Sequence, residues 1–97
     1  MTLDEFRATL TADTPPAPLT APLRALWHDA KGHWDQAHEI AQAESNQDGD
    51  TIHAYLHRVE GDPANAAYWY RRAGRPVATT PLAAEWDALV TEFLGRS

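Results

Sequence analysis

The tripeptide Gly61-Asp62-Pro63 constrains the fold most, because it lies between two segments with helical periodicity. Glycine ends helices in the left-handed conformation, aspartate accepts free amides at a helix start, and proline suits the first helical position. Apolar residues recur at helical spacing on both sides: Ile52, Tyr55, Leu56 and Val59 before it, and Ala66, Trp69, Tyr70 and Ala73 after it. The pattern predicts two antiparallel helices, a hairpin over about residues 50–74 that ends at Gly74.

A second hairpin is predicted over about residues 20–44, with its turn at Lys31-Gly32. When the chain is slid along itself until Gly32 falls on Gly61, other residues also come into register. This offset aligns small residues and a histidine, namely Ala25 with Ala54, Ala37 with Ala66, and His28 with His57. Because small residues suit the point where two helices touch, the offset indicates an internal repeat of one helix-turn-helix unit.

The remaining segments are also predicted to be helical. A short helix is expected over residues 2–12, followed by a proline-rich connector over 13–18. Residues 44–50 are polar and contain Asp48-Gly49-Asp50, which predicts a turn before a helix capped by Asp50 or Thr51. A C-terminal helix over about 80–95 is predicted to cap the exposed end of the repeat. The fold class expected for residues 1–97 is therefore a single all-α domain of about six helices.

Residues 53–76 resemble the tetratricopeptide and Sel1-like repeats. The resemblance lies in Ala54, His57, Gly61, Ala66, Tyr70, Ala73 and Pro76, and in the run from Asn65 to Ala73. The whole chain is also similar to a group of small bacterial proteins of unknown function, through the phrases Trp-Asp-x-Ala-His and His-Ala-Tyr-Leu-His-Arg-x-Glu-Gly-Asp. Repeats of this kind generally bind other proteins, so the resemblance implies an interaction role.

The composition of the chain argues against some classes of partner and some locations in the cell. The formal net charge is −6, with 8 Lys and Arg against 14 Asp and Glu, which disfavours nucleic acid as a partner. The sequence lacks an apolar run of the length that a membrane span needs, about 18 residues. It contains no cysteine, and Asp4 and Glu5 lie where a signal peptide would carry positive charge. We therefore expect a cytoplasmic protein.

The histidines are the strongest chemical candidates. His53 and His57 lie four residues apart, so a helix places both imidazoles on one face, where they can meet one metal ion. His28 could join them from the equivalent helix of the first hairpin, and His38 from its partner helix. The repeat register, however, places His28, His53 and His57 where helices pack, which favours structural rings with polar partners. The alternative is a metal-binding protein or metal-dependent enzyme that uses His28, His53 and His57.

The leading functional hypothesis is a non-enzymatic protein-interaction module that needs no cofactor. It has an unknown protein partner, with a homodimer as one option. The chain has no cysteine nucleophile and no glycine-rich phosphate loop. In the repeat register Asp29, Tyr55 and Arg58 point toward the groove between the first helices of the two hairpins, which is the predicted binding face. A third hypothesis is a pH-responsive protein, because protonation of the five histidines removes most of the net charge.

Overall fold

The computed structural model of the protein describes residues 1–96 and contains six α-helices and no strand within them. The elements are α1 (Leu3–Ala8), the 3-10 turn η1 (Thr9–Thr11), α2 (Ala21–Ala30), α3 (Trp34–Ala43), α4 (Gln47–Val59), α5 (Pro63–Ala73) and α6 (Leu82–Arg96). The predicted all-α class is confirmed, with the two hairpins as α2/α3 and α4/α5. None of the described helices combines the length and the apolar character required to cross a membrane.

The two hairpins turn in the same way. Gly32 and Gly61 have left-handed φ angles of 80° and 83°. In each turn the amide that follows the glycine reaches back to a carbonyl in the last turn of the helix, from His33 to His28 at 2.8 Å and from Asp62 to His57 at 2.9 Å. These bonds are the signature of a Schellman motif, which requires a left-handed residue at the glycine. The repeat offset is therefore present in the turn hydrogen bonds as well as in the sequence.

The start of α4 differs from the prediction. The helix begins at Gln47 because the side chain of Asn46 accepts the Gly49 amide at 2.8 Å. Asp48-Gly49-Asp50 is the first helical turn and not a loop. A Cβ atom at Gly49 would collide with the backbone carbonyl of Glu44, so the glycine allows close approach of two backbone segments.

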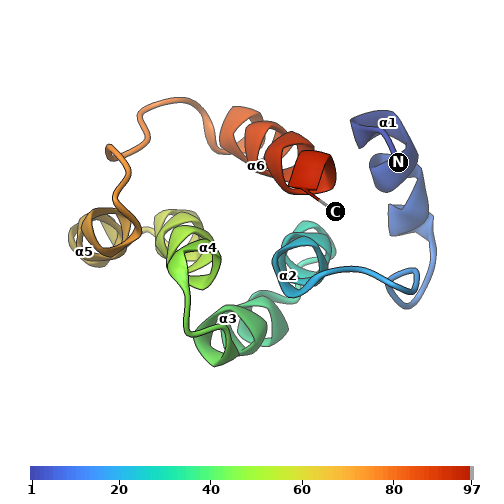
Figure 1. The fold of residues 1–97 in the computed structure, drawn as a ribbon, viewed down its shortest axis with the longest axis horizontal. Helices are drawn as coiled ribbons and strands as arrows, with labels where there is room; N and C mark the ends of the chain where they lie inside the picture. Colours follow the sequence, from blue (N-terminus) through green and yellow to red (C-terminus); the bar gives the residue numbers. More distant parts are fainter. Residues whose placement is uncertain (97) are drawn as a thin grey trace.

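Helix α6 lies along the inner face of both hairpins, whereas the sequence predicted that it closes the end of the repeat. Figure 1 shows α2 and α4 facing α6, with α3 and α5 on the outer side and α1 beside α6. The Trp86 indole of α6 donates to the Leu26 carbonyl of α2 at 3.0 Å, and its ring lies 5.8 Å from that of Phe6. The reason is apolar burial: α2 and α4 each present an apolar face there, and α6 covers both.

One main core results from this arrangement. It joins buried side chains of α1, α2, α3, α4 and α6, and its largest fully buried members include Trp27, Phe6, Leu23, Leu26, Ile52, Leu56 and Val90. A smaller cluster of Ala54, Ala66 and Tyr70 joins α4 to α5. The inner face of α4 packs in this core, and its other face contacts α3 and α5.

Candidate metal centre

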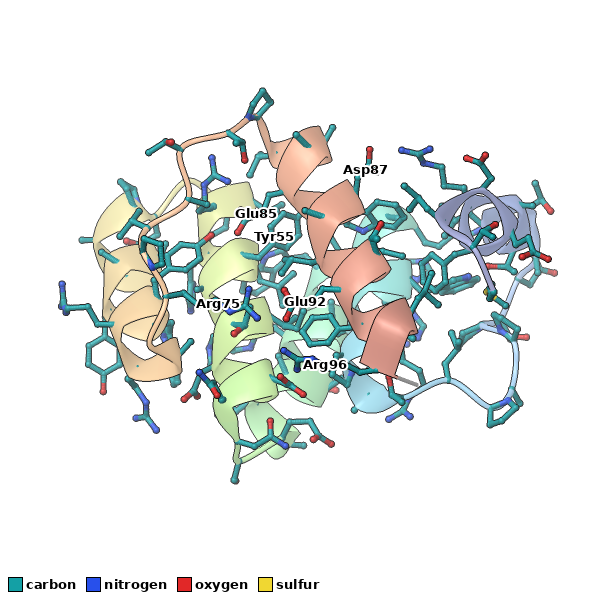
Figure 2. The ribbon with its side chains drawn as sticks, turned by 45° about the horizontal axis from the view of Figure 1, so that its top comes forward. Tyr55, Arg75, Glu85, Asp87, Glu92 and Arg96 are labelled. Carbon is teal, nitrogen blue, oxygen red and sulfur yellow. The ribbon has the colours of Figure 1, made fainter. Side chains whose placement is uncertain are left out.

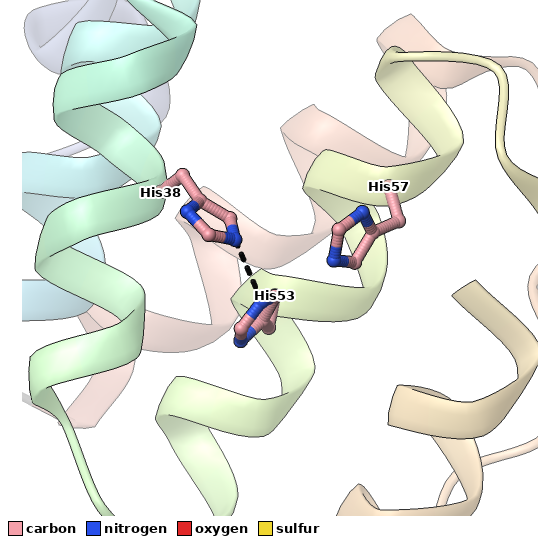
Figure 3. A group of neighbouring side chains, drawn as sticks. All are labelled: His38, His53 and His57. Atoms are coloured by element: carbon pink, nitrogen blue, oxygen red, sulfur yellow. Dashed lines mark hydrogen bonds between the residues drawn. The ribbon is translucent and has the colours of Figure 1, made fainter. Parts of the chain in front are cut away.

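Three histidines meet where α4 packs against α3. His53 and His57 lie one turn apart on α4 and are 5% and 6% exposed. His38 comes from α3 and is half-buried. Figure 3 shows the three rings turned toward one another across the contact between the two helices. The spacing of four residues on α4 is what places two of the rings on the same face.

The ring nitrogens are close enough to share an ion. One nitrogen from each ring lies within 4.8 Å of one nitrogen from each of the other two. His38 Nε2 and His53 Nε2 are hydrogen-bonded at 2.8 Å, while the rings of His53 and His57 stack at 4.9 Å between centroids. Two nitrogens on one tetrahedral zinc ion, each at about 2.05 Å, are roughly 3.3 Å apart. The bonded pair would therefore open by about half an ångström to bind zinc.

Two tryptophans fix the orientation of the rings. The Trp34 indole stacks on His38 at 4.8 Å with an interplanar angle of 12°, and Trp69 stacks on His53 at 3.8 Å and 11°. Trp34 is itself held by its indole N–H, which donates to the Leu56 carbonyl at 2.8 Å. Rings held in this way are preorganised, so less conformational entropy is lost when a ligand binds.

Burial keeps two of the rings neutral. The pKa of His53 is lowered to about 4, first by desolvation and then by the neighbouring His38, His57 and Arg72. The pKa of His38 is also lowered by desolvation and by His57, against the opposing pull of nearby carboxylates. At neutral pH both imidazoles are therefore uncharged and carry a nitrogen lone pair, the form that a metal ion requires.

His57 has two polar neighbours beyond the cluster. Its Nδ1 is 2.6 Å from Glu60 Oε1, and its Nε2 is 3.3 Å from the side-chain amide nitrogen of Asn65. His57, Glu60 and Asp62 also form a group of ligand atoms within 4.8 Å at the bend of the second hairpin. Asp62 caps α5, as the sequence predicted: its side chain accepts a hydrogen bond from the backbone amide of Asn65 at 3.2 Å.

A pocket of about 360 Å³ adjoins His53 on the surface. Its lining includes Trp69, Arg72, Asp50 and Asn46, from α4, α5 and the residue that caps α4. The Arg72 guanidinium lies 4.9 Å above the Trp69 ring and 3.7 Å from the Asp50 carboxylate. The pocket therefore lies beside the one small part of His53 that is exposed.

Of the three metal ligands predicted from the sequence, His28, His53 and His57, the structure brings two together. The structure brings His53 and His57 together, but His28 lies against His33, with their Nδ1 atoms 3.3 Å apart. Burial lowers the pKa of His28, and the nearby His33 and Arg24 lower it further. The third ring of the cluster is His38, which the sequence offered only as an additional approach. The signal for it is Trp34-x-x-x-His38, an aromatic stack one turn long on α3.

The predicted binding face is largely internal. Tyr55 is buried and its hydroxyl donates to Asp29 Oδ2 at 3.2 Å. Burial raises the pKa of Asp29, which the Tyr55 hydrogen bond partly opposes. Arg58 points to α6, where it pairs with Glu85 and donates to the Thr80 carbonyl at 2.7 Å. Figure 2 shows Tyr55 and Glu85 between α4 and α6. The chain's own last helix thus covers the Arg58 side of the groove expected to hold a partner.

Comparison with known proteins leaves this geometry as the main guide to function. Neither the protein-family models, nor the curated proteins, nor the solved structures give a significant match to the chain. The resemblance to tetratricopeptide and Sel1-like repeats stays a prediction, with the repeated turn at Gly32 and Gly61 in its favour.

Proposed function

We propose that the protein binds a divalent transition metal ion, such as zinc, through His38, His53 and His57. The observation that carries this proposal is the convergence of three imidazole nitrogens within 4.8 Å at the contact between α3 and α4. Imidazole is the commonest metal ligand in proteins, and a set of three leaves a fourth position for water or another ligand.

The surroundings support ligation in two ways. The rings of His38 and His53 are neutral at neutral pH, so binding an ion requires no net loss of a proton from either ring; the Nε2 that donates in their mutual hydrogen bond passes its hydrogen to Nδ1. The tryptophans stacked on them restrict their rotation. An ion held by residues of both helices would also link the first hairpin to the second. We therefore propose metal binding that stabilises the junction between the hairpins.

Metal titration of protein made without a polyhistidine tag tests the proposal. We expect zinc and cobalt to bind in a 1:1 ratio by calorimetry, and bound cobalt to show the intense visible bands of a tetrahedral site. At free zinc about 100 times the dissociation constant, the free energy of unfolding should rise by about 2.7 kcal/mol.

A matched pair of variants assigns the ligands. His38→Gln should remove binding, whereas His33→Gln, a change at an exposed histidine outside the cluster, should leave it intact. If neither zinc nor cobalt binds to the wild type or shifts its unfolding, the three histidines have only a structural role.

The interaction module is a second candidate, supported by one observation. A pocket of about 390 Å³ opens between α1, α2, α4 and α6, and its lining includes Asp29 and Tyr55 of the predicted face together with Leu10, Ala83 and Trp86. An ion pair of Arg7 with Asp87, at 2.5 Å, joins α1 to α6 beside it. We propose a second copy of the chain as the occupant to be tested, since a homodimer is the one option named for the otherwise unknown protein partner.

Sedimentation of the wild type and of Ala83→Arg separates the outcomes. Ala83 is exposed, so a charged side chain there should leave the fold intact and block the pocket. Dimerisation that Ala83→Arg abolishes supports the interaction hypothesis. A wild type that stays monomeric at high concentration contradicts the homodimer, and does so independently of metal binding.

A further inference from the structure

We infer that Glu60 positions His57 as a metal ligand by holding its imidazole in the tautomer that carries hydrogen on Nδ1. The Nε2 lone pair is then the one offered to the ion. This inference rests on the proposed metal site and concerns a residue outside the three ligands.

The contact between Glu60 and His57 is local and well formed. Glu60 is the C-terminal cap of α4, three residues after His57, and its Oε1 lies 2.6 Å from His57 Nδ1. The His57 side chain is 7% exposed and that of Glu60 is 36% exposed. An ionised carboxylate only accepts hydrogen bonds, so Nδ1 must be the donor in this pair.

The other side of the ring imposes the same tautomer. The Asn65 side-chain amide nitrogen lies 3.3 Å from His57 Nε2. With this nitrogen facing the ring, Nε2 is the acceptor, because an amide NH₂ group only donates. Glu60 at the end of α4 and Asn65 in the first turn of α5 thus agree, and the bend at Gly61 is what brings both to the ring. The Asn65 bond is long for its kind, so an ion can replace it at Nε2.

The tautomer decides whether three lone pairs can converge. A neutral imidazole has one N–H and one lone pair, and the opposite tautomer would point a hydrogen atom at the ion. Metal-bound histidines usually donate their other N–H to a carboxylate or carbonyl, which orients the ring and increases its basicity. Glu60 satisfies this requirement for His57, while its own oxygen is occupied by Nδ1.

The variant Glu60→Gln tests the assignment with little change of shape. A glutamine amide can accept from Nδ1–H or donate to a bare Nδ1, so it supports both tautomers. We expect zinc affinity to fall about 10-fold to 100-fold, the range typical of lost outer-shell carboxylates. The control Glu39→Gln removes an equal charge from an exposed residue next to His38 in sequence, and should change the affinity less than about threefold.

Nitrogen-15 NMR of the histidine rings gives a readout independent of zinc. In the metal-free wild type His57 should show the Nδ1–H tautomer, and Glu60→Gln should shift it toward a mixture. Detection of the Nε2–H tautomer in the wild type overturns the inference, even if the variant fails to fold. If the wild type binds zinc and Glu60→Gln binds it equally well, only the inference is wrong. If the wild type binds neither zinc nor cobalt, the metal site itself is wrong and the inference falls with it.

Discussion

The two hairpins share a turn but give the equivalent histidine opposite surroundings. His28 and His57, which the repeat offset makes equivalent, both supply the carbonyl that closes the Schellman turn. His28 is partly exposed and contacts His33, whereas His57 is buried among His38, His53, Glu60 and Asn65. The same local sequence signal therefore leads to a surface ring in one copy and to a buried cluster in the other.

The difference arises from the neighbours of each first helix. Helix α2 has only α3 on its outer side, while α4 has both α5 and the α3 of the preceding hairpin (Figure 1). It is this extra neighbour that supplies Trp34 and His38 to the cluster. The candidate site therefore belongs to the junction between the two hairpins and not to a single hairpin.

The largest expected effect is on metal binding at the two equivalent positions. His57→Gln should abolish zinc binding, because only two imidazoles remain, whereas His28→Gln should leave the zinc affinity within about twofold. The affinity loss in His57→Gln should exceed the 10-fold to 100-fold range typical of outer-shell changes. Calorimetry of both variants against the wild type is the measurement.

An equal loss of binding in the two variants would contradict this difference between the hairpins. It would mean that the ion lies at His28 and His33, or that binding is nonspecific. Circular dichroism of the metal-free variants serves as the folding control, since glutamine is close to histidine in volume and keeps a polar group at each site.

The next largest effect is on stability and concerns Glu85, the partner of Arg58 on the inner face. Arg58 is the residue that the repeat offset makes equivalent to Asp29. Glu85 of α6 is buried, pairs with Arg58, and accepts the Tyr70 hydroxyl at 2.5 Å. Glu85→Ala should lower the free energy of unfolding by about 3 kcal/mol, because it leaves the buried Tyr70 hydroxyl without its acceptor and also removes the ion pair of Arg58. Urea unfolding measures this.

A control on the same helix is available. Glu92 pairs with Arg75 and Arg96 where all three side chains are partly exposed, so Glu92→Ala should cost no more than about 1 kcal/mol. Equal effects of the two changes would show that Glu85 does not anchor α6 to the second hairpin.

Much of the fold could be predicted from local signals in the sequence. Glycine in the left-handed region, Asp62 at a helix start and apolar periodicity are short-range features, and they located both hairpins. The predicted cap of α4 was wrong because Asp-Gly-Asp is a common turn signal, and only the contact of Gly49 with the Glu44 backbone explains a glycine within a helix. The contact spans only five residues, but it depends on the Glu44 carbonyl facing Gly49, and the residue types do not indicate that orientation.

The site was harder to predict, because its parts come from separate elements. The i, i+4 spacing identified His53 and His57, but the third ring depended on which helix packs against the outer face of α4. The repeat register favoured His28, and long-range packing placed His38 there instead. Long-range packing also explains why the groove around Tyr55 and Arg58 was expected to be open. Sequence periodicity does not show whether α6 packs on the end of the second hairpin or along the inner face of both hairpins.

The turn glycines allow a test of how alike the hairpins are. Gly32→Ala and Gly61→Ala should each lower the free energy of unfolding by about 1 to 2 kcal/mol, the strain of a left-handed alanine. No atom lies within 4 Å of a Cβ built at either position, so backbone strain alone acts. Urea unfolding should give values for the two variants that agree within the error of the measurement. A clear difference would show that one turn is held by its surroundings more than the other.

The smallest effect, and the one with a distinctive pH dependence, is expected at Asp29. Burial raises the pKa of this carboxyl above its usual value, so the folded state binds the proton more readily than the unfolded state. Protonated Asp29 therefore stabilises the folded protein. This stabilisation is complete at a pH below the pKa of Asp29 in the unfolded chain, about 3.9, and is lost as the pH rises through its pKa in the folded protein. At pH 7 the buried carboxylate therefore carries a desolvation cost. An asparagine side chain would not carry that cost, so Asp29→Asn should raise the free energy of unfolding at pH 7 by less than about 1 kcal/mol, while keeping an acceptor for the Tyr55 hydroxyl.

Urea unfolding of Asp29→Asn and the wild type at pH 7 and pH 4 separates burial from hydrogen bonding. The gain should shrink toward pH 4, because protonation removes the charge from the wild-type side chain as well. If Asp29→Asn is instead less stable at pH 7, the charge-assisted bond from Tyr55 outweighs desolvation. The first hairpin would then be tied to the second by a polar contact as important as that of Arg58 with Glu85, and the contrast between the two hairpins would be confined to their histidines.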